Sequence, residues 1–398
     1  MIARNQFLEE LISFKDKDLI KVVTGIRRCG KSTLFEIYID YLKQNGVEEN
    51  QIVHINLAEK ENSHLREENA LYNYLISRLL KEKMTYYFVD EVQMCIGWET
   101  AIDSLYIKKT SDVYITGSNA YLLSGELATL LSGRYVEIKM FPLSFAEYIS
   151  AFDDSPNLEN RYNDYITKSS FPYALKLSQK KDISAYLEGI INSIVLKDVM
   201  KRKKITDVAM LESVIDFTAD NIGNLTSTKS ISDTMTSNGR KIAVQTVENY
   251  LSALCDSYIF YKIGRYDIKG KEHLKTGDKY YISDIALRFH LLGNKSPDFG
   301  RILENIVALE LMRRGYKIGI GKVGNTEVDF VATTPYDGTE YYQVAFTVRE
   351  KSTLARELTP LDSISDHNPK FLLTMDNDPV ADHNGIKQLY VLDWLLDK

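Results

Sequence analysis

The segment 25–32, with the sequence GIRRCGKS, constrains the fold of this chain most, because it matches the pattern G-x-x-x-x-G-K-[ST]. It follows the apolar run 20–24 and precedes an amphipathic stretch over 31–44, so we expect a strand, a turn and a helix. The glycines let backbone N–H groups turn inward around a phosphate, and the helix N-terminus adds positive potential. The motif therefore predicts a nucleotide-binding domain.

Two side chains of this loop have predicted roles in holding ATP and Mg²⁺, which are the expected cofactors. Lys31 is predicted to reach the β- and γ-phosphates, and the hydroxyl of Ser32 is predicted to ligate Mg²⁺. Loop residues contribute mainly backbone N–H groups, so the thiol of Cys29 is interpreted as incidental. The residues predicted to bind the nucleotide are Gly25, Ile26, Arg27, Arg28, Cys29, Gly30, Lys31, Ser32 and Thr33.

Strand-like and helix-like runs alternate from residue 19 to about residue 140. The predicted strands are 20–24, 52–57, 86–90, 113–116 and 135–139, and the predicted helices are 31–44, 68–81, 98–108 and 120–131. This alternation predicts an α/β domain whose parallel sheet is covered on both faces.

Asp90 and Glu91 come directly after the third predicted strand. The carboxyl ends of parallel strands meet at one edge of a sheet, so we expect both acids near the phosphate loop. Asp90 is predicted to hold the hydration shell of Mg²⁺, and Glu91 to polarise the attacking water. The alternative is a solvated strand end. With Glu91 as base, hydrolysis is favoured over nucleotide storage.

Three further residues are candidates for the catalytic site. Ser118 or Asn119, after the fourth strand, is predicted to hydrogen-bond to the attacking water or the γ-phosphate. A turn that caps the next helix explains these two residues nearly as well. Arg134, which opens the fifth strand, is a candidate for stabilising the transferring phosphate, in cis or for a neighbouring subunit. An ordinary surface arginine is the alternative.

Composition excludes several classes of protein. The 398 residues contain 49 Lys and Arg against 55 Asp and Glu, and this net charge of −6 argues against a histone-like coat but leaves room for a local basic face. No apolar run approaches the roughly 18–20 residues of a membrane-spanning helix. The start lacks the apolar core of a secretory signal, and three cysteines without paired spacing exclude a disulfide framework. We therefore expect a cytoplasmic protein without a membrane partner.

The region 153–295 is predicted to be mostly helical, with one hairpin. It fits a winged helix in which 241–257 is the recognition helix and 258–283 is the wing. Its basic side chains could meet the phosphates of DNA. Packing against the ATPase core, or binding to a protein, is the alternative. The basic residues are Lys201, Arg202, Lys203, Lys204, Arg265, Lys269, Lys271 and Lys275.

Several short segments carry a resemblance to a known family, namely 25–33, 90–91, 116–119, 132–135 and the FPLSF run at 141–145 with Glu147. Together they resemble a family of prokaryotic AAA+-type ATPases. The resemblance implies a phosphate loop, an acid pair, a sensor at Ser118 or Asn119 and a functional arginine at Arg134. It also implies a winged-helix region and a C-terminal domain of nuclease-like fold. AAA+ relatives often assemble, so homo-oligomerisation stays open.

The last hundred residues resemble the core of PD-(D/E)xK nucleases. Asp329 matches the Asp of the pattern, whereas Gln343 and Ala345 stand where the pattern has Glu and Lys. This chemistry needs acids that hold Mg²⁺ and a Lys near the attacking water, so we expect a domain that does not cleave. Glu304 and Glu327 leave some metal-binding potential.

The sequence thus predicts an AAA+-like P-loop ATPase core over 1–152, a helical lid with a winged helix over 153–295, and a nuclease-like α/β domain over 296–398. The expected function is that of a Mg²⁺-dependent ATP-hydrolysing switch, with DNA as a candidate partner. The alternatives are an ATP-gated metal-dependent nuclease and a nucleotide-binding regulatory scaffold with low turnover. Glu91 favours the switch over the scaffold, and Gln343 with Ala345 favours it over the nuclease.

Overall fold

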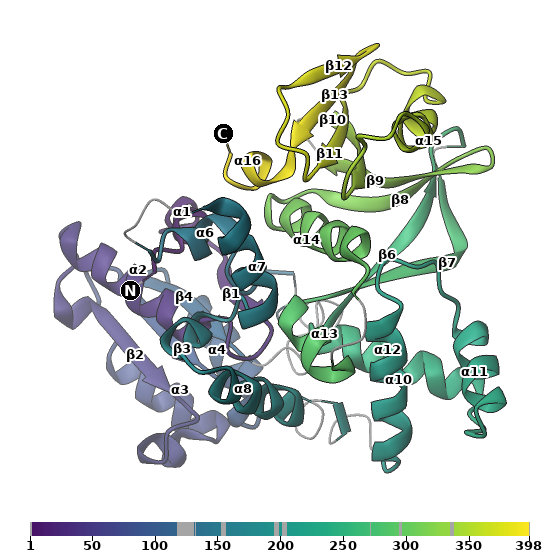
Figure 1. Cartoon of the computed structure of the whole chain (residues 1–398). Coiled ribbons are helices and arrows are strands. Elements are labelled where there is room, and N and C mark those ends of the chain that lie inside the picture. Colours follow the sequence, from purple (N-terminus) through teal and green to yellow (C-terminus); the bar gives the residue numbers. More distant parts are fainter. Residues whose placement is uncertain are drawn as a thin grey trace. The chain divides into compact units, whose positions relative to one another are not determined.

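The computed structural model describes residues 2–117, 131, 133–152, 157–194, 199–200, 205–270, 272–293, 297–334 and 338–397. These residues form two compact units, and Figure 1 shows their elements. Unit 1 contains Met1–Pro142 together with the short segment Asp256–Tyr258. Unit 2 contains Leu143–Ser193, Val199–Cys255 and Ile259–Lys398.

Unit 1 is built on a parallel sheet of five strands with the order β2-β3-β4-β1-β5. The strands are β1 (Ile20–Gly25), β2 (Ile52–Asn56), β3 (Thr85–Asp90), β4 (Ser111–Thr116) and β5 (Tyr135–Met140). The prediction of five strands in a parallel α/β sheet is confirmed. Strands β1 and β3 are buried along their whole length, as expected when both faces of a parallel sheet are covered.

Helices cover both faces of this sheet. Side chains of α3 and α4 pack with Tyr87 and Val89 on one face. On the other face, Phe35 of α2 contacts the ring of Phe88 edge-on, with 5.2 Å between ring centroids. The helical elements of unit 1 are α1 (Asn5–Ser13), α2 (Lys31–Gln44), α3 (Glu68–Ser77) and α4 (Trp98–Tyr106), with short 3₁₀ turns at Glu49–Gln51, Glu61–Leu65 and Val92–Met94. The helix predicted over 120–131 lies outside the described residues, apart from residue 131.

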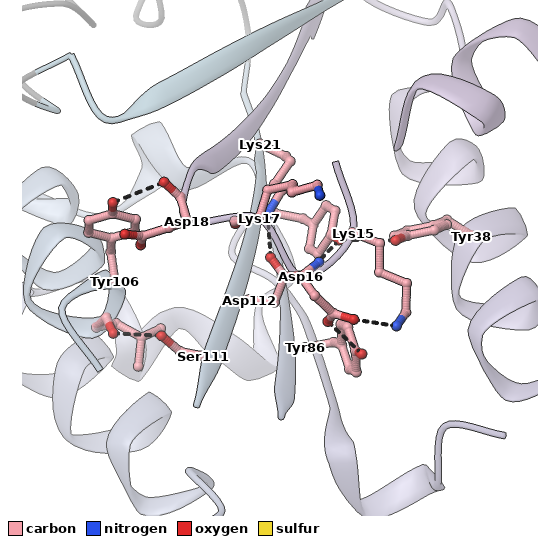
Figure 2. A network of polar contacts seen from close by, with 12 residues as sticks. Lys15, Asp16, Lys17, Asp18, Lys21, Tyr38, Tyr86, Tyr106, Ser111 and Asp112 are labelled. Carbon is pink, nitrogen blue, oxygen red and sulfur yellow. Dashed lines mark hydrogen bonds and ion pairs between the residues drawn. The ribbon is translucent and has the colours of Figure 1, made fainter. Parts of the chain in front are cut away.

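A buried polar network lies at the amino end of this sheet (Figure 2). Lys21 of β1 donates to Asp112 of β4 over 2.5 Å, and both side chains are at most 1 % exposed. The second carboxylate oxygen of Asp112 accepts from the hydroxyl of Tyr114 and from the backbone N–H of Asp16. Burial raises the pKa of Asp112, and the charge of Lys21 opposes this rise. The network ties the chain that enters β1 to the neighbouring strand.

Unit 2 is built on a mixed sheet of eight strands with the order β12-β13-β11-β10-β9-β8-β6-β7. The strands are β6 (Phe260–Asp267), β7 (Glu272–Ile282), β8 (Lys317–Val323), β9 (Thr326–Thr334), β10 (Gly338–Ala345), β11 (Lys370–Thr374), β12 (Ala381–His383) and β13 (Ile386–Tyr390). The strands predicted in the last hundred residues correspond to β9, β10, β11 and β13, whereas β8 and β12 were not predicted.

The helices of unit 2 precede and flank this sheet in the sequence. They are α6 (Phe145–Ile149), α7 (Leu158–Lys168), α8 (Lys180–Ser193), α10 (Val208–Asp220), α11 (Thr228–Ser237), α12 (Val244–Asp256), α13 (Ile285–Leu292), α14 (Phe299–Arg313), α15 (Lys351–Asp362) and α16 (Val391–Leu395), with a 3₁₀ turn at Pro172–Lys176. In the part of the chain that the structure describes, no helix is long and apolar enough to cross a membrane.

The predicted hairpin exists, but it belongs to a larger sheet than the sequence suggests. Strands β6 and β7 pair antiparallel, and β6 also pairs in parallel with β8. Without β8, the edge of β6 that faces away from β7 would expose unpaired backbone N–H and C=O groups, and pairing with β8 satisfies them. One sheet therefore joins residues on both sides of 295/296, where the sequence analysis set a domain boundary.

Candidate nucleotide-binding site

The phosphate loop connects the end of β1 at Gly25 to the start of α2 at Lys31. Gly25 has φ of +140°, and a Cβ atom at this position would lie 2.3 Å from the carbonyl oxygen of Met140. Gly30 is left-handed with φ of +102°. The buried side chains of Ile26 and Cys29 anchor the loop in the core. Glycine is therefore required at position 25 by close approach as well as by conformation.

Lys31 and Ser32 occupy the first turn of α2. The ammonium of Lys31 donates to the carbonyl oxygens of Gly25 (2.9 Å) and Ile26 (3.2 Å), so the loop itself positions the charge. The residue before the helix is Gly30, which has no side chain to cap the first N–H groups. These groups and the helix dipole favour an anion at this end, next to the exposed hydroxyl of Ser32.

Arg4 also holds the loop in place, and the sequence analysis did not identify this role. Its guanidinium donates to the carbonyl oxygen of Cys29 (2.9 Å) in the loop and to that of Phe141 (2.7 Å) after β5. The side chain is buried. The bond to Cys29 links the chain start to the phosphate loop, and no periodicity or motif in the sequence signals such a contact.

The acid pair lies at the same edge of the sheet as the phosphate loop. The hydroxyl of Thr116 at the end of β4 donates to Asp90 and accepts from the backbone N–H of Glu91 over 3.2 Å. Thr116 is in register with Val23, two residues before Gly25. Since β4 lies between β1 and β3, the axes of these two strands are about 10 Å apart.

Asp90 has an oxygen that fits a role toward Mg²⁺. The carboxylate is 1 % exposed, and its Oδ2 atom has no hydrogen-bond partner among the described residues. A buried carboxylate oxygen without a partner is costly, so a cation or its water shell is the natural complement. With the exposed hydroxyl of Ser32, the donor set consists of oxygen atoms, which Mg²⁺ prefers.

Glu91 is held in an unusual conformation. Its backbone is left-handed, with φ of 56° and ψ of 47°, which is rare for a residue other than glycine. The side-chain amide of Gln93 donates to its carboxylate. Strain of this kind clusters at functional sites, so the turn supports a role for the orientation of Glu91. Gln93 is a second residue that sequence reasoning missed.

Of the other predicted catalytic residues, the structure describes only Arg134. Ser118 and Asn119 lie outside the described residues. Arg134 precedes β5, and its carbonyl oxygen accepts from the N–H of Ile20 at the start of β1. Its guanidinium contacts Asp103 over 3.3 Å. Strand β1 extends roughly 16 Å from this edge to the loop, so the structure separates Arg134 from the loop of its own chain.

Of the basic side chains predicted to contact DNA, the structure describes those of Arg265 and Lys269. Lys201, Arg202, Lys203, Lys204 and Lys271, together with the side chain of Lys275, lie outside the described residues. Arg265 belongs to β6, and Lys269 belongs to the turn after it.

A pocket of about 600 Å³ beside β10 lies in the C-terminal part of unit 2, but it is not basic. The charged residues in its lining are the two arginines Arg349 and Arg356 against the acids Asp298, Glu350 and Glu357. This lining does not favour a phosphate.

The loop after the first strand and the acids after the third, with one strand between them, are the features of a P-loop ATPase domain of the AAA type. A family model described as an AAA domain matches residues 17–149. An uncharacterized protein of Haemophilus influenzae is 41 % identical over 405 residues, which cover 100 % of this chain and 99 % of that protein. The chain therefore belongs to the same family of AAA-domain proteins.

Three further comparisons found similar proteins. A second family model, described as a domain of unknown function, matches residues 159–298. An uncharacterized protein of Methanocaldococcus jannaschii is 28 % identical over 354 residues, or 83 % of this chain and 75 % of that protein. The solved structure of a Walker-type ATPase of Pyrococcus abyssi has a TM-score of 0.50 at 16 % identity, covering 73 % of this chain and 96 % of that one, and shows a similar fold.

Proposed function

We propose that the protein binds ATP with Mg²⁺ at the loop 25–33 and hydrolyses it as a nucleotide-driven switch. The observation that carries this proposal is the buried Oδ2 atom of Asp90, which lacks a partner among the described residues at the edge of the sheet where β1 delivers the loop. A scaffold that only stores nucleotide would not need a left-handed Glu91 held by Gln93.

Each residue has a role that follows from its place. The N–H groups of the loop and the first turn of α2 bind the phosphates, and Lys31 neutralises charge on the β- and γ-phosphates. Asp90 and Ser32 would hold Mg²⁺, which supplies further charge neutralisation when bound. Glu91 accepts a proton from the attacking water.

The test is phosphate release from ATP by the purified protein in the presence of Mg²⁺, compared with Lys31→Ala. We expect the wild-type protein to release phosphate and the variant to lose ATP binding and turnover together, because the positive charge between the phosphates is gone. Equal rates in both proteins would reject the proposal. A fluorescent ATP analogue measures binding separately from turnover.

Tyr258 offers a route by which the nucleotide could act on the rest of the chain. Its hydroxyl donates to Glu137 over 2.9 Å, and Glu137 also accepts from Thr24, the residue directly before Gly25. Tyr258 is left-handed with φ of 60°, which is strained for a bulky residue. It belongs to unit 1, whereas Cys255 and Ile259 on either side of its short segment belong to unit 2.

Removing the hydroxyl in Tyr258→Phe is expected to uncouple α12 and β6 from the nucleotide. A hydrogen bond to a carboxylate contributes about 1.5–3 kcal/mol, so the coupling should weaken roughly tenfold or more. Hydrogen exchange of α12 and β6 with and without an ATP analogue measures it. Tyr106→Phe, which loses a hydroxyl bond to the carbonyl oxygen of Asp18, is the matched control. An unchanged nucleotide response in Tyr258→Phe would remove this route.

The interpretations of 153–295 as a winged helix and of 296–398 as a nuclease-like fold remain part of the proposal. Helices α11 and α12 followed by the β6–β7 hairpin support the first. DNA and a second copy of the chain remain candidate partners. An arginine at the edge occupied by Arg134 could act on the nucleotide of a neighbouring copy.

A further inference from the structure

Lys279 of β7 lies among three carboxylates in the C-terminal part of unit 2. Its ammonium is 2.9 Å from Glu304 of α14, 2.8 Å from Glu327 and 3.7 Å from Asp329, the last two on β9. The Lys279 side chain is 5 % exposed. Three segments far apart in the sequence therefore converge on one buried positive charge.

The packing of α14 against β7 fixes this arrangement. The side-chain amide of Asn305 accepts from the backbone N–H of Ile282 and donates to its carbonyl oxygen, over 2.8 and 2.9 Å. The hydroxyl of Tyr281 donates to Glu304 over 2.6 Å. Gly223 stands close by, where a Cβ atom would lie 3.3 Å from Glu304. The carboxylate of Glu304 therefore has little freedom to turn away from Lys279.

Asp329 and the neighbouring Gln343 also form hydrogen bonds to other groups of the protein. Asp329 accepts from the backbone N–H of Val344 over 2.9 Å. Gln343 accepts from the N–H of Asp329 and donates to Glu357 over 2.9 Å. Gln343 therefore binds protein groups on both sides of its amide. Ala345 adds no charge.

Electrostatics favours a cation at this position, because the buried acids Glu304 and Asp329 and the partly exposed Glu327 would repel each other without one. Burial would lower the pKa of Lys279, but Glu304, Asp329 and Glu327 raise it above its ordinary value, so the ammonium stays charged. Burial and then the charge of Glu304 raise the pKa of Asp329 above its ordinary value, and the charge of Lys279 opposes this rise.

We propose that the ammonium of Lys279 takes the place of the divalent cation in this cluster, so that the C-terminal sheet binds no metal. An ammonium carries three donors and fits carboxylates at hydrogen-bond distance, whereas Mg²⁺ needs oxygen ligands at about 2.1 Å. With Lys279 in place, no group of three or more His, Cys, Asp or Glu side chains in the described ranges is arranged to hold a metal. The inference concerns a site separate from the phosphate loop and stands or falls independently of ATP hydrolysis.

The first test measures Mn²⁺ binding to the full chain by electron paramagnetic resonance, without nucleotide. We expect the wild-type protein and Asp329→Asn to bind Mn²⁺ equally, since any site at the phosphate loop is common to both. A wild-type Mn²⁺ site that disappears in Asp329→Asn would overturn the proposal, and so would Mn²⁺-dependent DNA cleavage that disappears in that variant.

The second test exchanges the occupant of the cluster. Lys279→Met should gain one Mn²⁺ site, and adding Asp329→Asn should remove it. Mn²⁺ at about a hundred times its Kd should raise the Tm of Lys279→Met by roughly 5–10 °C, with no such shift in wild-type protein. Lys262→Met, which removes an exposed ion pair with Asp278 on the same hairpin, is the control. A folded Lys279→Met without a new Mn²⁺ site contradicts the proposal; if this variant does not fold alone, the wild-type comparison decides.

Discussion

Replacing Glu91 by Gln is expected to slow ATP hydrolysis by about 10²- to 10⁴-fold while ATP binding persists, because general-base catalysis typically contributes a factor of this size. The amide keeps the size of the carboxylate and loses only its ability to take a proton. The turn around Glu91 is fixed by the hydroxyl of Thr116 and by Gln93, so the backbone geometry should survive. Single-turnover phosphate release with a fluorescent ATP analogue separates the two quantities.

Two comparisons make this prediction specific. Lys31→Ala should lose binding, whereas Glu91→Gln should keep it, so that only the second variant accumulates the ATP-bound state. Glu99→Gln in the first turn of α4 removes the same charge at a residue without a predicted catalytic role, and it should turn over normally. If Glu91→Gln hydrolyses ATP at the wild-type rate, another group acts as the base and the role of the strained turn must be sought elsewhere.

Unit 1 could be predicted from the sequence because its signals are local. The run 20–24, the glycines and the amphipathic stretch 31–44 each specify their own conformation, and the parallel order brings Asp90 to the loop edge without further information. Arg4 and Gln93 could not be predicted, because they act through side-chain contacts that depend on the folded chain.

The sheet of unit 2 was harder to predict from the sequence, because two glycines weaken the strand pattern of β8. Gly319 and Gly321 make β8 a weak strand by propensity, yet the neighbouring strands need them. A Cβ atom at Gly319 would lie 3.1 Å from the side chain of Tyr266, and one at Gly321 would lie 2.9 Å from Ile268 and Val331. Because β8 was not predicted, the sequence did not indicate that the β6–β7 hairpin joins the C-terminal sheet. The position of Lys279 in that sheet could therefore not be predicted either.

We expect the stability of unit 1 to depend strongly on a single charge at the amino edge of its sheet. Asp112→Asn leaves the ammonium of Lys21 buried opposite a neutral amide (Figure 2), and breaking such a pair costs about 3–5 kcal/mol. This is a large part of the roughly 5–15 kcal/mol that stabilises a typical domain. Urea denaturation followed by tyrosine fluorescence should show the unit 1 transition at a clearly lower denaturant concentration.

Replacing Lys21 and Asp112 together should be tolerated, although replacing Asp112 alone should not. Lys21→Met combined with Asp112→Leu removes both charges at similar volume, and such exchanges are often neutral or stabilising. We therefore expect the double variant to recover most of the stability lost in Asp112→Asn. Lys83→Met, which breaks the exposed pair with Glu48, should have no measurable effect. A double variant as unstable as Asp112→Asn would mean that the hydrogen bonds from Tyr114 and Asp16, rather than charge balance, make this edge depend on Asp112.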